Sequence, residues 1–336
     1  PQRASEQNMT ENKQNNSKKG VLLANLGTPA APERKPVARF LREFLSDPRV
    51  VDLPRYLWLP LLNLVIIPLR AGRSAAAYRE IWGPDGSPLL VLTRQLADRL
   101  ATRLSGSAEV RVGMRYGEPS ILGGLQQLKS AGVTDLAVIP LYPQFSDTTT
   151  SSIYDAVDEG LRKLDWAPKL HRVEDYHDHP AWVSALAASI RSFREENGSA
   201  EKLIFSLHGI PQRFVDKKGD PYEQQCRASV ALVAEALDFS SEEWMLTFQS
   251  RVGREPWLQP YTDITLKELA ASGVKHVQVA CPGFAVDCLE TLEEIAMQNC
   301  EFFEQAGGEK LEYIPALNDS PAHAEALEAL LQDWLG

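Results

Sequence analysis

The sequence predicts an α/β protein with two doubly wound, Rossmann-like domains, each built on a parallel sheet. Short apolar segments alternate with longer helix-like segments along most of the chain, a pattern typical of parallel sheets covered by helices. The chain has 336 residues, of which 44% are hydrophobic, and this length favours two domains over one. Three short motifs also recur in the same order in both halves, which indicates two related units.

Six strands and eight helices account for this alternation. The expected strands are short runs rich in apolar residues, at 21–26, 109–116, 136–142, 202–208, 244–250 and 276–282. The expected helices are longer and mix polar with apolar residues, at 87–104, 119–131, 151–164, 180–196, 221–237, 262–272, 287–305 and 320–335. Because ligands of such folds lie beyond the carboxyl ends of the strands, the residues there are the candidates for a site.

The recurring motifs all lie at these strand ends. ANLGTP (24–29) is similar to FSLHGIP (205–211), MRYGEP (114–119) to QSRVGREP (249–256), and YPQFSD (142–147) to CPGFAVD (281–287). This order predicts an N-terminal domain over 20–165 and a C-terminal domain over 166–315, facing each other, followed by a C-terminal helix over 316–336. A dinucleotide or P-loop site is disfavoured, because neither glycine motif follows any expected strand.

Two segments fall outside this pattern. Residues 1–19 are polar and rich in Asn and Gln, which predicts a disordered tail. The stretch LPRYLWLPLLNLVIIPLR, 53–70, is apolar but contains three internal prolines, so we expect short helical pieces and turns rather than one helix. Two interpretations stay open for it: burial within the protein, or an exposed apolar lip over 53–73 that rests on a membrane surface.

Charge and cysteine content restrict the partners and the compartment. The formal net charge of −10 disfavours a nucleic-acid partner. The four cysteines form no CxxC pair, which fits a reducing compartment. We therefore expect a cytoplasmic protein, with peripheral contact of 53–70 to the inner face of the cytoplasmic membrane as an option.

His208 and three acids are the residues best suited to chemistry. His208 ends an expected strand and opens a Gly/Pro loop, where an imidazole can accept a proton, bind a metal or merely pack. Asp287, Glu290 and Glu294 follow another strand end at spacing i, i+3 and i+7, which would align them on one face of an α-helix. A helix cap would explain the first two acids but not Glu294. With the histidine, such acids could hold a divalent metal loosely and accept protons.

Several motifs together resemble the ferrochelatase family, in the form usual for Gram-negative bacteria. The motifs are LANLGTP, VGMRYGEPS, PLYPQFSDTTTSS, SLHGIP, KGDPY, FQSRVGREPWLQP and PGFAVDCLETLEEI. The resemblance extends from about Gly20 to Pro321 and implies a class II chelatase-like fold, in which two Rossmann-like domains with parallel four-stranded sheets hold a porphyrin between them.

The resemblance also implies roles for individual residues. It places the active-site histidine at His208 and the glutamate at Glu290, both as catalytic and metal-binding residues, with Asp287 and Glu294 on the path of the ion. The substrate-binding positions that it implies are Leu26, Arg70, Ser87, Arg115, Tyr116, Tyr142, Phe248, Trp257 and Phe284. Leu26 stands where relatives carry Met or Tyr, and Cys288 where many animal relatives carry His.

The reaction implied is the insertion of Fe²⁺ into protoporphyrin IX with release of two protons, the last step of haem synthesis. Fe²⁺ is then a substrate, and no resident cofactor is expected. The terminal cysteines that hold an iron–sulfur cluster in animal relatives are not found in LLQDWLG, 330–336. Whether His208 or Glu290 takes the pyrrole proton stays open.

Two alternatives remain beside this interpretation. A chelatase that inserts cobalt or nickel into another tetrapyrrole would be expected to use more than one histidine, and His208 is the one histidine at a candidate strand end. A porphyrin or haem carrier could use the same cleft, but the acids would then have no purpose.

Overall fold

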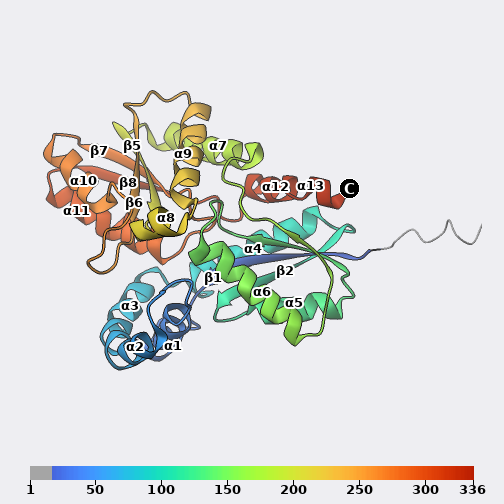
Figure 1. The fold of residues 1–336 in the computed structure, drawn as a ribbon. Helices are drawn as coiled ribbons and strands as arrows, with labels where there is room; N and C mark the ends of the chain where they lie inside the picture. The colour runs from blue at the N-terminus through green and yellow to red at the C-terminus, as the bar shows by residue number, and fades with distance from the viewer. Residues whose placement is uncertain (1–16) are drawn as a thin grey trace, which may run out of the picture.

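The chain forms two α/β units, each built on a four-stranded parallel sheet (Figure 1). The structure, a computed structural model, describes residues 17–336. The strand orders are β2-β1-β3-β4 and β6-β5-β7-β8, and every neighbouring pair is parallel. Since the two orders are equivalent, the predicted fold class and the relationship between the two halves are confirmed.

The first unit contains four strands and the helices that connect them. Its strands are β1 (Lys19–Gly27), β2 (Ala108–Tyr116), β3 (Asp135–Pro140) and β4 (Lys169–Arg172). Its helices, among which η denotes a π-helix, are α1 (Arg34–Leu45), α2 (Arg55–Leu61), η2 (Leu62–Ile66), α3 (Ile67–Ile81), α4 (Pro88–Arg103), α5 (Ile121–Ser130), η3 (Asp147–Ser151) and α6 (Ser152–Lys163).

The second unit repeats this plan and ends in two further helices. Its strands are β5 (Lys202–His208), β6 (Trp244–Gln249), β7 (His276–Ala280) and β8 (Lys310–Ile314). Its helices are α7 (Pro180–Asn197), α8 (Gln212–Lys218), α9 (Tyr222–Ala236), α10 (Thr262–Ala271), η4 (Glu290–Asn299) and α11 (Cys300–Gln305), followed by α12 (Pro321–Ala329) and α13 (Gln332–Leu335).

Alternate residues of each central strand face opposite helical layers, as the pleat of a strand requires. In β1, Leu22 and Ala24 pack with α5 and α6, whereas Val21 and Leu23 pack with α4. Both faces of each sheet are therefore buried, which is why the central strands are mostly apolar.

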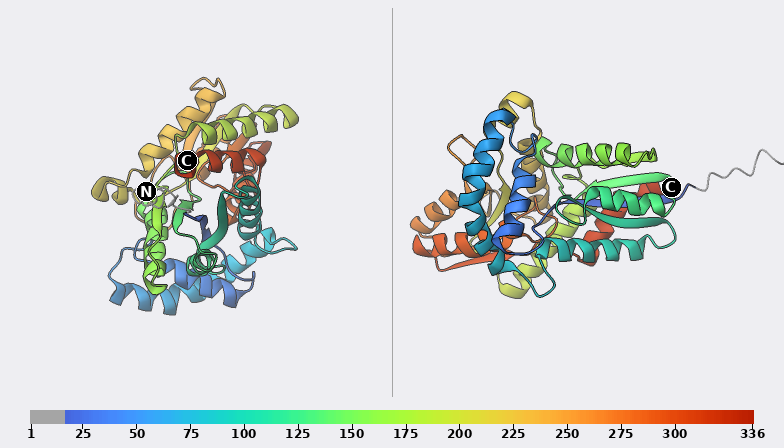
Figure 2. Two further views of the ribbon diagram at one scale, coloured as in Figure 1. Left: turned by 90° about the vertical axis from the view of Figure 1, so that its right-hand side faces the viewer. Right: turned by 90° about the horizontal axis from the view of Figure 1, so that it is seen from below.

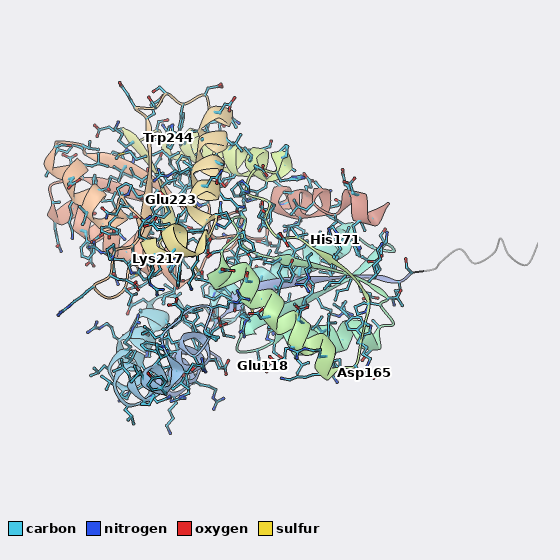
Figure 3. All side chains as sticks on the ribbon, viewed as in Figure 1. Glu118, Asp165, His171, Lys217, Glu223 and Trp244 are labelled. Carbon is cyan, nitrogen blue, oxygen red and sulfur yellow. The ribbon has the colours of Figure 1, made fainter. Side chains whose placement is uncertain are left out.

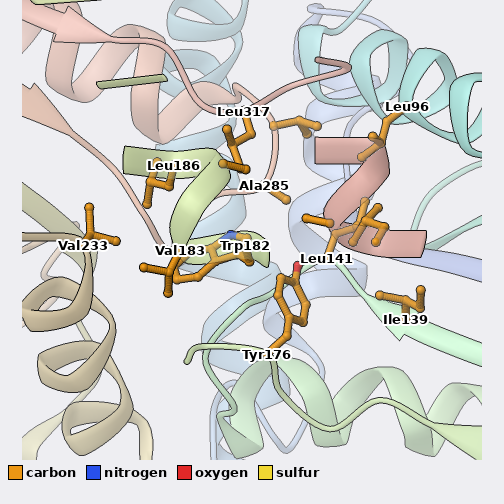
Figure 4. Close-up of a cluster of buried hydrophobic side chains, with 14 of the residues drawn as sticks. Leu96, Ile139, Leu141, Tyr176, Trp182, Val183, Leu186, Val233, Ala285 and Leu317 are labelled. Carbon is orange, nitrogen blue, oxygen red and sulfur yellow. The ribbon is translucent and has the colours of Figure 1, made fainter. Parts of the chain in front are cut away.

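One apolar cluster joins the two units (Figure 4). Ile139 of β3 and Leu96 of α4 belong to the same cluster as Trp182 of α7 and Val233 of α9. The C-terminal helices add to this junction, because α12 lies between α4 and α7 (Figure 2). A continuous core of this kind holds the two units as one body.

The structure corrects several predicted boundaries. β4 belongs to the first sheet, so the boundary at 165/166 was too early, and the helix expected over 316–336 is divided into α12 and α13. β4 and β8 were missed because they are edge strands with many polar residues. Lys19, expected in the tail, is the first residue of β1, and the rest of that tail lies mostly outside the described residues.

The apolar segment 53–73 is helical over most of its length, contrary to the expected turns. Pro60 lies within α2, and Pro68 lies in the first turn of α3, where a missing N–H costs little. Between them, η2 changes the hydrogen-bond pattern locally, so that the chain continues in helical form. Among residues 17–336, no helix combines the length and apolar character of a membrane-spanning segment.

This segment is both lip and core. Leu57, Leu64 and Leu69 are 60%, 76% and 72% exposed, whereas Leu62 is fully buried. Trp58 is half-buried, and its indole donates a hydrogen bond to the carbonyl of Leu45 at 2.6 Å. One face of the segment is therefore buried and the other is exposed, and contact of the exposed face with a membrane stays a prediction.

Candidate active site

His208 is the last residue of β5, and one hydrogen bond determines its tautomer. Its Nδ1 lies 2.6 Å from the carbonyl oxygen of Gly209, and since a carbonyl only accepts, Nδ1 must carry the proton. Nε2 of the neutral ring then has a free lone pair. Trp257 and Phe284 flank the ring, with centroids 6.4 and 6.5 Å away. A half-buried base between aromatic side chains can bind a metal or accept a proton.

Glu290 and Glu294 come from a π-helix rather than the expected α-helix. η4 begins at Glu290 and extends over ten residues, which is unusually long for this helix type. The wider turn of a π-helix breaks the i, i+3, i+7 alignment but keeps residues four positions apart near each other. His208 pairs in register with Gln249, whose side-chain amide donates to the Glu290 carbonyl and to the Glu294 carboxylate, so all three residues lie around the ends of β5 and β6.

Glu294 is held by the end of β6. Its carboxylate accepts hydrogen bonds from the backbone N–H of Ser250 at 2.7 Å, from the Ser250 hydroxyl at 2.5 Å and from Gln249 Nε2 at 3.3 Å. Ser250 has a φ of +66°, a strained conformation for a residue other than glycine. This backbone geometry directs both donors of one residue at the same carboxylate.

The environment of Glu294 favours its protonated form. Burial raises its pKa, the Ser250 hydroxyl and His208 oppose that rise, and the charge of Glu290 adds to it. The result is a pKa above the ordinary value of 4.5. Glu294 is therefore better suited than an ordinary surface acid to exchange a proton near neutral pH.

Side chains of the first unit face Glu290 from the opposite direction. Burial raises the pKa values of Tyr78 in α3 and Tyr142 after β3, and the charge of Glu290 raises both further. Leu26, at the end of β1, packs in the same apolar cluster as Tyr78 and Leu289. The acids thus face neutral phenols and an apolar wall.

Leu26 is also the structural counterpart of His208. Leu26 has the same place in LGTP (26–29) as His208 has in HGIP (208–211), and both lie at the carboxyl ends of the central strands β1 and β5. One side of the junction therefore presents an imidazole and the other a hydrocarbon side chain.

Asp287 does not lie above Glu290 and Glu294 on one helix face, and that prediction was wrong. Asp287 precedes η4, is buried, and accepts hydrogen bonds from Thr291, Tyr313, Ala316 and Asn318. The expectation failed because it assumed an α-helix that begins at residue 287.

The other expected substrate-binding residues have varied surroundings. Phe248 is a core residue, 2% exposed, and Ser87 is buried, where its hydroxyl accepts from Thr28 at 2.8 Å. Arg115 and Tyr116 both donate to Asp47 Oδ2, at 2.6 and 2.8 Å. Arg70 is exposed on α3.

The Asp47 cluster is a structural feature of the first unit. Burial opposes the charge of Asp47, but donors that include Ser152, the Arg49 amide and Tyr116, together with the charge of Arg115, outweigh it and lower its pKa. Arg115 Nε and Nη2 and the Tyr116 hydroxyl all form hydrogen bonds within this cluster.

Sequence reasoning missed three residues of the site. Gln249 and Ser250 open the motif QSRVGREP, so the signal was present, but no residue type in it pointed to a carboxylate clamp. Tyr78 lies in a helical stretch, AAAYREI, that carries no sign of a site. Only the packing of α3 against η4 brings it there.

The site is open rather than a closed metal cage. Among residues 17–336, one group of three potential metal ligands has all its ligand atoms within 4.8 Å of one another. This group is Asp175, His177 and Asp178. His208, Glu290 and Glu294 are thus more widely spaced than a preformed three-ligand site. A surface pocket of about 510 Å³ lies elsewhere, between α4 and the start of α12.

Comparisons with known proteins agree with these observations. The family model described as Ferrochelatase matches residues 18–335. The chain is 54% identical over 316 residues to the ferrochelatase of Methylococcus capsulatus, which covers 94% of this chain and 96% of that protein. It is 51% identical over 325 residues to the ferrochelatase of Alcanivorax borkumensis, which covers 96% and 95%.

Solved structures are similar in fold. SirB from Bacillus subtilis, in a structure with Fe³⁺, superposes with a TM-score of 0.56 at 11% identity and covers 94% of this chain and 95% of that chain. CbiX, the terminal enzyme of sirohaem biosynthesis in denitrifying bacteria, gives a TM-score of 0.50 at 16% identity, with 92% and 98% covered. The chelatase arrangement of the two sheets, the match to the family model along nearly the whole chain and the identities near one half together show that the chain belongs to the ferrochelatase family.

Proposed function

We propose that this enzyme inserts Fe²⁺ into protoporphyrin IX, giving protohaem and two protons, as the last step of haem synthesis. The observation that carries the proposal is the placement of His208, Glu290 and Glu294 around Gln249, near an apolar cluster that includes Leu26. Metal insertion needs both a base for the pyrrole protons and oxygen ligands that release the ion again.

The porphyrin lies between the two units in this proposal. Trp257 and Phe284 flank His208, and the indole N–H of Trp257 has no hydrogen-bond partner among residues 17–336. Leu26 and Tyr142 belong to the facing wall. Contacts along the macrocycle would distort it from planarity, at a strain of about 1–5 kcal/mol, and so expose the lone pairs of its pyrrole nitrogens.

His208 is the group best placed to take the pyrrole protons, because Nε2 is its free lone pair. Glu290 and Glu294 guide Fe²⁺ and balance the charge that changes as protons leave. Glu294, with its raised pKa, can accept a proton in turn. Asp287, proposed from sequence as a further ion ligand, is not part of this path, because its carboxylate is already occupied by four donors.

Fe²⁺ is a substrate here, and the proposal needs no resident cofactor. The alternatives are a chelatase that prefers cobalt or nickel and a carrier without turnover. The deciding experiment is anaerobic incubation of the protein with protoporphyrin IX and Fe²⁺, Co²⁺ or Ni²⁺, with metallation followed by absorbance. We expect catalytic turnover with Fe²⁺, whereas porphyrin binding without turnover would mean a carrier, and faster turnover with cobalt or nickel would mean another chelatase.

The exposed part of segment 53–73 supports a peripheral membrane contact at the cytoplasmic face. Leu57, Leu64 and Leu69 project into solvent, and Arg70 and Arg73 are exposed beside them. An apolar surface edged by arginines suits an anionic bilayer surface. It would also give the apolar substrate a direct route to the enzyme.

A further inference from the structure

Asp287 is a buried carboxylate that accepts four hydrogen bonds from protein donors. It is 6% exposed. Its Oδ1 accepts from Tyr313 Oη at 2.5 Å, Thr291 Oγ1 at 3.1 Å and the Ala316 N–H at 3.3 Å, and its Oδ2 accepts from Asn318 Nδ2 at 2.7 Å. A carboxylate has about four lone-pair sites. Three of the four hydrogen bonds go to Oδ1 and one goes to Oδ2, so protein donors fix the orientation of the carboxylate.

Asn318 both donates a hydrogen bond to Asp287 and accepts one from it. It receives a hydrogen bond from the Asp287 backbone N–H at Oδ1, at 2.8 Å, while its own Nδ2 donates to the carboxylate. Its backbone N–H donates to the carbonyl of Ala285 at 3.1 Å, and its carbonyl accepts from His323 Nδ1 at 2.6 Å. Asn318 therefore fastens the loop before η4 to the start of α12, and its φ of +50° is one that Asn tolerates.

Thr291 transmits this contact into the first turn of η4. Its hydroxyl accepts from the Cys288 N–H at 3.0 Å and lies 3.1 Å from Asp287 Oδ1, to which it donates. Glu290 lies between these residues in the chain, and its carbonyl accepts from Gln249 Nε2 at 2.8 Å. The start of η4 is thus held from two sides, by Asp287 and by Gln249.

We propose that Asp287, together with Asn318 and Tyr313, is a positioning residue that sets where η4 begins. Its task is to fix the π-helical register that brings Glu290 and Glu294 to the same side, next to His208. This inference rests on the proposed function, since it assigns a role within that site, and it removes Asp287 from the set of metal ligands.

An exchange of the two side chains tests the inference. D287N leaves two amides with donors facing each other, and N318D leaves two facing carboxylates. The double variant D287N/N318D restores one donor group and one acceptor group in reversed order. A positioning pair tolerates this reversal, whereas a metal ligand moved from residue 287 to residue 318 does not.

We expect each single variant to lower kcat by about tenfold or more with the KM for Fe²⁺ changed less than about threefold, and the exchange to recover most of the loss. Hydrogen exchange of the amides of 288–292 should be faster in both single variants and should return toward wild type in the double variant. D319N is the matched control, because Asp319 is a neighbouring acid that pairs with Arg99 on the surface; it should behave as wild type.

The opposite pattern would overturn the inference. If D287N mainly raises the KM for Fe²⁺, if N318D has little effect and if the exchange is as impaired as D287N, then Asp287 is a ligand. Should a single variant fail to fold, Y313F removes one donor only and should still speed exchange in 288–292 without raising the KM for Fe²⁺. A wild-type protein that does not metallate porphyrin defeats the proposed function, whereas the hydrogen-exchange result still decides the role of Asp287.

Discussion

At His208, a hydrogen bond to a backbone carbonyl leaves Nε2 as the free ring nitrogen. Because the side chain is half-buried and ends a strand, its removal opens no core cavity. We expect His208→Ala to lower metallation by about 10²–10⁴-fold, the usual contribution of a positioned acid or base. The thermal melt should stay unchanged. Activity within tenfold of wild type, about 1.4 kcal/mol in the barrier, would show that the histidine is structural.

Glu290 and Glu294 differ in how firmly they are held. Glu294 receives three hydrogen bonds from Gln249 and Ser250, while the side chain of Glu290 faces the phenols of the first unit. We expect Glu290→Gln to cost more kcat, and Glu294→Gln mainly to raise the KM for Fe²⁺, as lost ion delivery predicts. Steady-state kinetics at varied Fe²⁺ and porphyrin separate the two effects. If both variants instead weaken porphyrin binding equally, these acids do not form an ion path.

Ser250 sets the proton affinity of Glu294. Burial is the main cause of the raised pKa, and the Ser250 hydroxyl is the largest opposing influence. Ser250→Ala should therefore raise the pKa of Glu294 further. Since a carboxylate binds a cation in its ionised form, the pH at which Co²⁺ binding by the porphyrin-free protein is half-maximal should move upward. Ser272→Ala, which alters a surface hydroxyl in a helix cap, is the control, and an unchanged or lower midpoint in Ser250→Ala would contradict the assignment.

At the scale of elements, the π-helices η2 and η4 are the features that sequence patterns did not predict. The pattern of Asp287, Glu290 and Glu294 was read with the period of an α-helix, and η4 has a different period. Likewise, the prolines of segment 53–73 were taken as breaks, although η2 lets the helical path continue through them. In both places the backbone geometry differs from the one that the sequence pattern predicted.

The faces of segment 53–73 can be separated by substitution. Replacing Leu57, Leu64 and Leu69 together by Ser should leave the thermal melt nearly unchanged, because all three are mostly exposed. The same variant should raise the KM for porphyrin and weaken binding to vesicles that contain anionic lipid. Leu62→Ser is the matched control: Leu62 is fully buried, and its loss should cost about 2–5 kcal/mol of stability. A large fall in melting temperature for the triple variant would show that these side chains are core.

For the whole molecule, sequence patterns predicted the repeated architecture of the two units and their apolar central strands. The ordered motifs at strand ends predicted two equivalent sheets, and the central strands were found because both their faces are buried. Edge strands such as β4 were missed since their pattern is polar. Contacts between units could not be predicted, because Tyr78 meets η4 only through the packing of α3.

One such contact lies where the apolar segment begins. Asp52, just before α2, accepts two hydrogen bonds from Arg213 of α8, at 2.5 and 2.6 Å, and pairs with Lys218 at 2.8 Å. In Figure 3, Lys217 marks α8 on the side of the second unit that faces α1–α3. Hydrogen bonds from Arg213, only partly opposed by burial and aided by Lys218, hold the pKa of Asp52 at about 2, below its ordinary value of 3.8.

A carboxyl group whose pKa is lower in the folded state stabilises the fold at pH values above its pKa in the unfolded state. This stabilisation is lost as the pH falls through its pKa in the folded state. Asp52→Asn should therefore lower the free energy of unfolding by about 1–2 kcal/mol at pH 7, and this difference from wild type should shrink between about pH 4 and pH 2. Denaturant titrations at several pH values measure this difference in stability. Asp216→Asn, on the same helix α8 as Arg213, is the control. Because Arg213 also pairs with Glu255, two residues before Trp257, the variant should loosen the contact between the units next to the aromatic wall and raise the KM for porphyrin. An equal stability loss at pH 7 and pH 2.5, with an unchanged KM, would show that this ion pair neither titrates as proposed nor sets the spacing of the two units.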